Sequence, residues 1–401
     1  MKSGSSFLLA ARQCEIAELE QLARTCELVG VIGRLVHALQ RERGLASVFL
    51  SSQGAIYAAQ REQQAAACRV VEQEVRVHFE QLDTDASRVR NGSRLFSRVA
   101  VALHGLEGLP VLRERIAAQA CEAPEATAAY IKLVAALLAV VFEAADAATD
   151  PEVSRALVAM FNFMQGKEFA GQERAFGARA FAAGAIAPEG VQQWRHLIDA
   201  QQGCFQAFAD FSDPEVLRAD QASRDPAVLA ELERLRRIGC TSRGPLEQEA
   251  SHAWYACCTR RIDAMKEVED LLALNLRRLC ETRIAQTRAE LRDQRALLEE
   301  IASRPVGTAP YGPQLERSIL DMVQEQSRRL QAMSDELDAV RSTLNERKVV
   351  ERAKGLLMAH RAMSEDEAYK ALRQMAMNQN RRLVDVAGAV LSLADVLPGG
   401  R

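Results

Sequence analysis

The chain has 401 residues, of which 48% are hydrophobic and only 5% aromatic, and its formal net charge at pH 7 is −3. This length is typical of two or three domains, and the small net charge does not indicate that the whole chain binds a polyanion or a membrane surface. Alanine, leucine, glutamate, arginine and glutamine are abundant, whereas the apolar–polar alternation of β-strands is not found in the sequence. We therefore predict an all-α fold.

The nine cysteines are scattered along the chain, without a Cys-x-x-Cys pair and without a histidine-rich neighbourhood. An odd number of cysteines with no regular spacing favours reduced thiols over a disulfide framework. We therefore expect a cytoplasmic protein with no metal site and no cofactor.

Neither the N-terminal segment nor the most apolar stretch predicts a membrane anchor. The apolar run that begins at Phe7 is too short for a signal peptide, and charged residues follow it closely. The longest apolar stretch, Leu133–Phe142, would cover only about half of a bilayer at about 1.5 Å per helical residue. We predict a buried core helix here and no membrane span.

Long helices separated by short polar joints are predicted from Glu15 to Cys280. Several joints place Ser or Asp before a proline, which is the combination of an N-cap and a first-turn proline that begins a helix. Long helices with short connections fold back as antiparallel bundles. The last of these helices is predicted to run from Gly244 to about Ser303 and to leave the bundle as a stalk. The joints are expected at residues 51–54, 82–85, 105–110, 149–151, 187–190, 212–214, 223–226 and 241–245.

Two patches in this region repeat one another. Residues 40–47 (QRERGLAS) and 172–179 (QERAFGAR) each place Gln, Glu and Arg before a glycine, within a helical stretch that is apolar on both sides. Glycine inside a helix costs about 1 kcal/mol relative to alanine. Gly44 and Gly177 therefore indicate a close approach at these points by another helix or by a small ligand.

The arginines of these patches need partners, because an unpaired buried charge costs several kcal/mol. One interpretation is an ion pair with Glu42, with Glu173, or with a carboxylate on another helix. The other is that two or three arginines face one small cavity and bind an anion. Guanidinium is planar and has paired N–H donors, so it suits a flat oxyanion such as nitrate, nitrite or a carboxylate.

This region resembles the NIT domain, an all-helical nitrate- and nitrite-sensing module. The resemblance covers roughly Val29 to Leu279 and rests on the stretches LVHALQRERGLASVFL and FAGQERAFGARAFAAG. It implies a pair of four-helix bundles in which arginines hold the ligand between helices. By motif, two of these arginines are Arg43 and Arg174. The third is assigned to Arg234, within a run that also contains Arg236 and Arg237.

A breaker-rich segment, residues 304–313 (RPVGTAPYGP), predicts a linker or a sharp corner after the sensor region. Over residues 314–344, apolar residues and one glutamine then recur at steps of three and four, which amounts to about four heptads. This pattern predicts a coiled coil, and the alternative is one more amphipathic helix packed on the sensor bundle. The heptad positions are Leu315, Ile319, Met322, Gln326, Leu330, Met333, Leu337, Val340 and Leu344.

Three short amphipathic helices are predicted from Asn345 onward. The second begins at Ser364, with Glu367 completing a capping box, and the third follows Asn380. This C-terminal segment carries ten Lys and Arg against seven Asp and Glu, a local charge of +3, whereas the preceding 344 residues carry −6. Its core is expected to contain Val350, Ala353, Leu357, Ala368, Leu372, Met375, Ala376, Leu383, Val386, Ala387, Val390 and Leu391.

The run ERAKGLLMAHRAMSEDEAYKALRQMAM in this segment resembles the ANTAR domain, a three-helix RNA-binding module of bacterial transcription antiterminators. The resemblance implies binding to paired stem-loops of a leader RNA, which prevents formation of a terminator. Basic side chains would neutralise phosphates or stack on bases splayed from a loop, so the affinity should be sensitive to salt. The expected RNA-binding residues are Arg347, Lys354, Gly355, Arg373, Arg381 and Arg382.

The predicted organisation is a helical lead-in (1–28), the NIT-like sensor (29–303), the linker (304–313), the heptad helix (314–344) and the ANTAR-like module (345–397). Both modules in this order resemble the nitrate-responsive antiterminators of nitrate-assimilation operons. The resemblance implies that nitrate or nitrite controls binding of leader mRNA. The heptads and the paired RNA sites favour a homodimer, either standing or RNA-induced.

Two other classes of function were weighed against this one. The first is a signalling protein that senses another small anion and whose C-terminal module binds protein. The second is an enzyme, for which the sequence offers no P-loop, nucleophile elbow or metal-ligand spacing. No catalytic residue is therefore predicted.

Overall fold

The computed structural model describes residues 4–82, 92–241, 244–303, 313–361, 363, 365–379 and 381–394. All of the regular secondary structure in these ranges is α-helical, which confirms the predicted all-α class. The chain divides into two compact units, Met1–Arg328 and Arg329–Arg401. Most of the predicted linker (residues 304–312) and the two predicted helix-start residues Ser364 and Asn380 lie outside the described residues.

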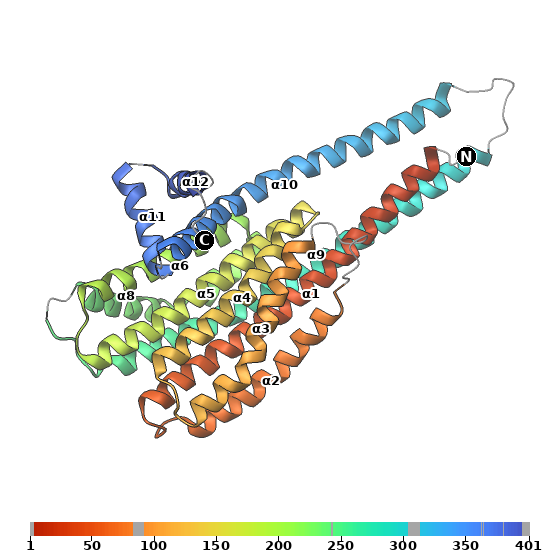
Figure 1. Cartoon of the computed structure of the whole chain (residues 1–401). Helices are drawn as coiled ribbons and strands as arrows, with labels where there is room; N and C mark the ends of the chain where they lie inside the picture. The colour runs from red at the N-terminus through yellow and green to blue at the C-terminus, as the bar shows by residue number, and fades with distance from the viewer. Residues whose placement is uncertain are drawn as a thin grey trace. The chain divides into compact units, whose positions relative to one another are not determined.

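The first half of unit 1 is a bundle of four helices (Figure 1). Within it, α1 packs against both α2 and α4, and α3 packs against α4. Each helix turns one apolar stripe inward, as the helical spacing of the apolar residues requires. The helices are α1 (Gly4–Ser51), α2 (Ala58–Glu80), α3 (Gly92–Ala117) and α4 (Ala123–Ala147).

The second half of unit 1 is built around α5, which packs against α6, α8 and α9. Three of its helices begin where the Asp-Pro joints predict. The side chains of Asp150, Asp213 and Asp225 accept hydrogen bonds from the first backbone N–H groups of α5, α7 and α8. The helices are α5 (Pro151–Ala183), α6 (Pro188–Phe211), α7 (Pro214–Ser223), α8 (Pro226–Thr241) and α9 (Ala250–Ser303).

The two halves of unit 1 are joined by α1 packed against α9 and by α4 packed against α5. Helices α1 and α9 run antiparallel, because Arg12 pairs with Glu290 while the Cys26 and Cys280 sulfurs lie 3.5 Å apart. The stalk predicted for α9 is therefore accompanied by the beginning of α1 (Figure 1). Helix α1 is also continuous across residue 28, where the predicted lead-in ends.

One predicted joint is wrong, because residues 105–110 lie inside α3. Leu106 and Leu109 are buried on the inner face of this helix, and Pro110 lies on its exposed side. Gly105 allows α4 to approach, since a Cβ at this position would lie 2.9 Å from a methyl carbon of Leu133. Tertiary packing therefore overrides the local helix-breaking signal.

The apolar stretch Leu133–Phe142 lies in α4, and most of its side chains are buried, as predicted. Helices α3 and α4 are each long and apolar enough to cross a membrane by length and composition alone. Both pack within the first bundle, and core helices of soluble proteins meet the same criteria.

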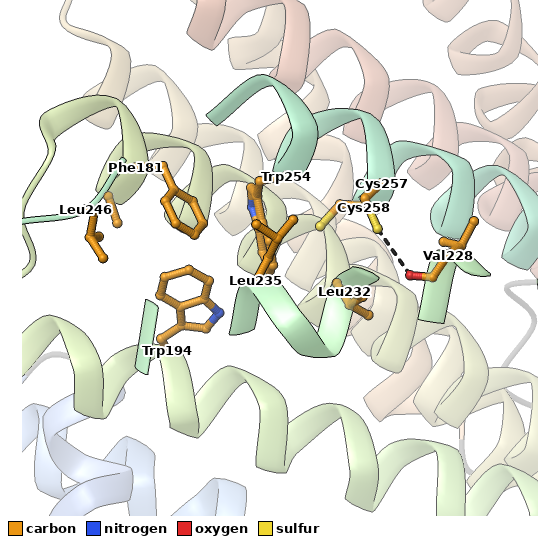
Figure 2. Close-up of a cluster of buried hydrophobic side chains, with 10 residues drawn as sticks. Phe181, Trp194, Val228, Leu232, Leu235, Leu246, Trp254, Cys257 and Cys258 are labelled. Atoms are coloured by element: carbon orange, nitrogen blue, oxygen red, sulfur yellow. Dashed lines mark hydrogen bonds between the residues drawn. The ribbon is translucent and has the colours of Figure 1, made fainter. Parts of the chain in front are cut away.

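A cluster of aromatic side chains fills the second half of unit 1 near the start of α9 (Figure 2). The rings of Trp194 and Trp254 meet edge to face with centroids 5.0 Å apart, and Phe181 contacts both. The backbone of α5 comes so close that a Cβ at Gly177 would overlap the Trp254 indole. The glycine of the second patch therefore marks a close approach by another helix.

Unit 2 contains α11 (Glu365–Gln379), α12 (Leu383–Ala394) and the part of α10 (Pro313–Arg361) from Arg329 onward. Helix α10 is continuous across residues 344 and 345, so no break separates the predicted heptad helix from the first predicted helix of the C-terminal module. Pairing through the heptads stays a prediction. The core of the module is made of Ala353, Leu357, Ala368, Leu372, Ala376, Val386 and Ala387, with the other predicted core residues partly buried around them.

Candidate anion-binding site

The two repeated patches lie against each other where α1 meets α5. A Cβ at Gly171 of α5 would lie 2.8 Å from Nη2 of Arg43, which belongs to α1. In the reciprocal arrangement, a Cβ at Gly44 of α1 would lie 3.2 Å from Nη2 of Arg174, which belongs to α5. Each arginine therefore lies over a glycine of the opposite helix, and the sequence repeat corresponds to a pair of facing guanidinium groups.

Arg43 is buried and is held by a carboxylate of the other bundle. Its guanidinium donates to both oxygens of Glu168 on α5, at 2.5 and 3.2 Å. Gln40 and Gln172 also donate to this carboxylate, at 2.8 and 2.9 Å. Glu168 therefore has several donors arranged around it, and a small oxyanion bound to Arg43 would meet the same donors.

Arg174 is equally buried, with an exposed fraction of 6%, but its partners are neutral. It donates to the Thr259 hydroxyl at 3.0 Å, and its guanidinium carbon lies 4.9 Å from the centroid of the Tyr255 ring. Within the part of the chain that the structure describes, no carboxylate forms an ion pair with it. Both neutral partners belong to α9, so this arginine connects the patches to that helix.

A second ion pair lies on α5 before Arg174. Lys167 of α5 and Glu269 of α9 approach to an N–O distance of 2.5 Å, and both side chains are almost completely buried. Burial lowers the pKa of Lys167, and its attraction to Glu269 opposes this shift. His37 on α1 is also affected, since burial and the nearby Lys167 lower the pKa of its imidazole to about 3. His37 is therefore neutral at physiological pH.

The buried charges at this crossing do not cancel. Arg43 is balanced by Glu168, Lys167 by Glu269 and the partly buried Lys266 by Asp270, whereas Arg174 has no carboxylate partner among the described residues. One positive charge is thus left over in a region that is largely closed to solvent. Burial of an uncompensated charge is costly, and a singly charged anion beside Arg174 would remove this cost.

The glutamates of the two patches face the interior of their own bundles instead. Glu42 accepts hydrogen bonds from Arg113 of α3 at 2.7 and 2.9 Å and from the Tyr130 hydroxyl at 3.0 Å. Adjacent residues of a helix point about 100° apart, so Glu42 faces the interior of its own bundle while Arg43 faces α5. Of the ion-pair partners considered for Arg43, the structure therefore shows a carboxylate on another helix, Glu168, and not Glu42.

Glu173 has the equivalent position in the second bundle. It accepts from Arg236 of α8 at 2.7 and 2.6 Å, from Trp194 at 3.0 Å and from Gln201 at 2.8 Å. Burial opposes ionisation of Glu173, but the hydrogen bonds from Arg236, Gln201 and Trp194 lower its pKa overall.

The structure brings Arg43 and Arg174 together but does not bring Arg234 to them. The side chain of Arg234 is 57% exposed and pairs with Glu231 of the same helix at 2.7 Å. Arg236, the neighbouring candidate, is the buried arginine of this run. The spacing of the buried residues Leu232, Leu235 and Gly239 would have placed residue 236 on the inner face of α8 and residue 234 outside it.

The site also contains residues that the sequence prediction missed. Glu168, Thr259 and Tyr255 carry no motif, and they meet the arginines only through contacts between distant parts of the chain. Trp254 strengthens the same connection, because its indole N–H donates to the Arg174 carbonyl oxygen at 3.0 Å.

In the C-terminal module, the predicted RNA-binding residues fall into three groups. Arg373 and Arg381 are exposed. Arg382 is also exposed and pairs with Glu346 and Asp385 at 3.2 and 3.3 Å. Lys354 is largely buried, with its ammonium nitrogen 6.0 Å from the centroid of the Tyr369 ring. The surroundings of Arg347 and Gly355 lie outside the described part of the chain.

Comparison with known proteins gives matches over both units. Residues 34–277 match the family model described as "Nitrate and nitrite sensing" (NIT), and residues 338–391 match the ANTAR domain. The chain is 36% identical over 388 residues to a nitrate regulatory protein of Klebsiella oxytoca, which covers 96% of this chain and 93% of that protein. It is also similar to the solved structure of the NasR transcription antiterminator, with a TM-score of 0.62, 34% identity and coverage of 98% of this chain and 99% of that one.

The fold and the two family matches thus define a regulatory class of protein, a helical sensor combined with a three-helix output module, and neither matched family is an enzyme family. More particularly, the chain belongs to the family of nitrate- and nitrite-sensing regulators that join a NIT domain to an ANTAR domain.

Proposed function

We propose that the protein is a nitrate-responsive transcription antiterminator and that nitrate or nitrite binds between Arg43 and Arg174. The observation that supports this most strongly is the positive charge of Arg174 at the crossing of α1 and α5, which has no carboxylate partner among the residues that the structure describes. A planar monoanion has the charge and the shape to satisfy both guanidinium groups. The match to the nitrate and nitrite sensing family supports the same ligand.

The anion would act by changing which groups the two arginines hold. It would take a place beside Arg174 and compete with Glu168 for Arg43, drawing α1 and α5 together. Because Arg174 also contacts Thr259 and Tyr255, the change would be passed to α9. A ligand shifts such an equilibrium only through its differential affinity for the two states.

The output would be RNA binding by the ANTAR module. We propose that the exposed Arg373, Arg381 and Arg382, with Arg347, Gly355 and Lys354, bind stem-loops of a leader RNA and so prevent termination, in the cytoplasm. Lys354 is largely buried, so it must become exposed to contact the RNA. The ANTAR match and the similarity to a transcription antiterminator support this proposal. Arg373 and Arg381 are exposed to solvent, so phosphates can reach their side chains.

Calorimetric titration of the full-length protein with sodium nitrate tests the ligand. We expect saturable binding of one anion per chain, weakened about tenfold to hundredfold in Arg43→Ala and in Arg174→Ala, as the loss of a charge-assisted hydrogen bond predicts. Arg234→Ala is the matched control and should bind as the unaltered protein does, because its side chain is exposed. Loss of binding in Arg234→Ala, or equal binding in all three variants, would contradict the site.

Two further titrations test the charge argument and the output. Sulfate, a dianion, should bind much more weakly than nitrate, whereas nitrite should compete with nitrate for the site.

Cognate leader RNA should bind the protein more tightly in the presence of nitrate. By linkage, nitrate should bind more tightly in the presence of the RNA. If nitrate affinity is the same with and without RNA, the coupling fails. Light scattering on the same samples would show whether a homodimer exists before RNA is added.

A further inference from the structure

A cavity separate from the two patches lies between α6, α7, the beginning of α8 and α9. Its volume is about 910 Å³, which is within the range of small-molecule sites in proteins. Its apolar walls are Phe205, Phe208, Leu217, Val228, Leu229 and Met265. None of these residues belongs to the proposed nitrate site.

Two arginines of α9 line this cavity without a carboxylate partner among the described residues. Arg261 is partly buried, donates to the Gln201 side-chain oxygen at 2.8 Å and lies 5.9 Å from the centroid of the Phe205 ring. Burial, followed by repulsion from Arg236, lowers its pKa, so its positive charge is poorly compensated. Arg260 lines the same cavity from the next position on the helix.

The acidic residues of the cavity are already engaged. Asp220 accepts from Arg224 at 2.5 Å, and the carboxylate of Asp225 caps α8 by accepting from the backbone of Ala227 at 2.8 Å. The lining thus carries three arginines against two aspartates, with the excess positive charge on α9. The lining combines an apolar wall with polar side chains and one excess positive charge, which suits a singly charged anion that has an apolar body.

We propose that this cavity is a second ligand site, which binds an amphipathic monocarboxylate with its carboxylate on Arg261 and Arg260 and its apolar body against Phe205 and Phe208. Nitrate is not the expected occupant, because it has no apolar body to contact the apolar wall and is too small to fill the cavity. Gln201 connects the two regions, since it accepts from Arg261 and donates to Glu173, the neighbour of Arg174.

The test titrates the full-length protein with 3-phenylpropionate, indole-3-acetate and octanoate, with 3-phenylpropionamide as the neutral control and acetate as the control without an apolar body. At least one of the three carboxylates should saturate one site per chain, and its neutral or truncated counterpart should bind at least tenfold more weakly. Arg261→Met should weaken binding at least tenfold. Absence of saturable binding of all three at millimolar concentration would overturn the proposal.

A bulky substitution at Gly203, an exposed position on the rim of the cavity, separates loss of the site from loss of the fold. A Cβ at Gly203 meets nothing within 4 Å, and Gly203 lines the cavity. Gly203→Phe should therefore abolish binding of the carboxylate, while Gly203→Ala should retain it and both should bind nitrate normally. Carboxylate binding that survives Gly203→Phe, or that nitrate displaces competitively, would assign the carboxylate to another place and overturn the proposal.

Discussion

Glu168 of α5 holds Arg43 of α1 with both of its carboxylate oxygens, across the boundary between the two bundles. An internal carboxylate is therefore already paired with the Arg43 guanidinium, which is the group that the proposed ligand must bind. The arrangement makes Glu168 a built-in competitor, which limits the affinity of the site and keeps Arg43 neutralised when the ligand is absent.

The first prediction concerns this competition. Glu168→Gln keeps the shape of the side chain but removes the competing charge and replaces one acceptor oxygen by an NH2 donor, so the hold on Arg43 is weakened and nitrate should bind about tenfold more tightly, equivalent to about 1.4 kcal/mol. Calorimetric titration measures the affinity. Glu231→Gln, on the outer surface of α8, is the matched control and should leave it unchanged. An unchanged or weaker affinity in Glu168→Gln would contradict the role of competitor.

The second prediction separates two arginines that are two positions apart. Arg236→Ala leaves the Glu173 carboxylate buried without its main cation, which should lower the free energy of unfolding by about 3 to 5 kcal/mol. Arg234→Ala removes an exposed pair and should change it by no more than about 1 kcal/mol. Denaturant unfolding followed by tryptophan fluorescence measures both, because the two tryptophans of the chain, Trp194 and Trp254, lie in unit 1. Equal effects of the two substitutions would refute the assignment of the buried pair.

The same two arginines show how far the sequence could predict the site. Helical spacing predicts the bundle helices, their Asp-Pro starts and the core of the C-terminal module, because these depend on neighbours three or four residues apart. The helical spacing of the apolar residues in α8 also predicts that residue 236 faces inward, although the resemblance to the sensor family favours Arg234. The pairing of Arg43 with Glu168 could not be predicted in this way, since 125 positions separate the two residues and only the packing of α1 on α5 brings them together.

The helix breakers illustrate the same limit. Gly44 and Gly177 were recognised as points of close approach, yet nothing local identified what approaches. The structure gives Arg174 for the first and Trp254 for the second. Pro110 locally predicts the end of a joint, but it lies inside α3, because burial of Leu106 and Leu109 against the bundle stabilises the helix.

The third prediction follows from the contact at Gly177. Gly177→Ala places a methyl group where the Trp254 indole lies, so overpacking should destabilise unit 1 by about 1 to 3 kcal/mol. Gly108→Ala in α3 is the matched control, because nothing lies within 4 Å of the new Cβ. This control should be neutral or more stable by up to about 1 kcal/mol, as helix propensity predicts. Denaturant unfolding distinguishes the two, and a stabilising Gly177→Ala would show that α5 and α9 are not packed this closely.

The fourth prediction concerns His37 and pH. Its pKa is lowered from an ordinary value of 6.5 to about 3 by burial and by the nearby Lys167, Lys266, Arg41 and Arg174. Between these two values the unfolded chain binds a proton at this residue that the folded chain does not. The free energy of unfolding therefore falls as the pH falls through this window, by about 1.4 kcal/mol per pH unit for one proton.

His37→Gln should remove this contribution and leave the behaviour above pH 6.5 unchanged. The measurement is the difference in unfolding free energy between the unaltered protein and the variant at several pH values from 4 to 8, with His104→Gln at an exposed position of α3 as the control. The difference between the unaltered protein and His37→Gln should change by about one proton's slope on the acidic side. Parallel curves over the whole range would mean that His37 takes up its proton equally in the folded and unfolded chains. The imidazole would then not be held neutral by its burial and by the cations of α1, α5 and α9, and the excess positive charge assigned to this crossing would have to be counted again.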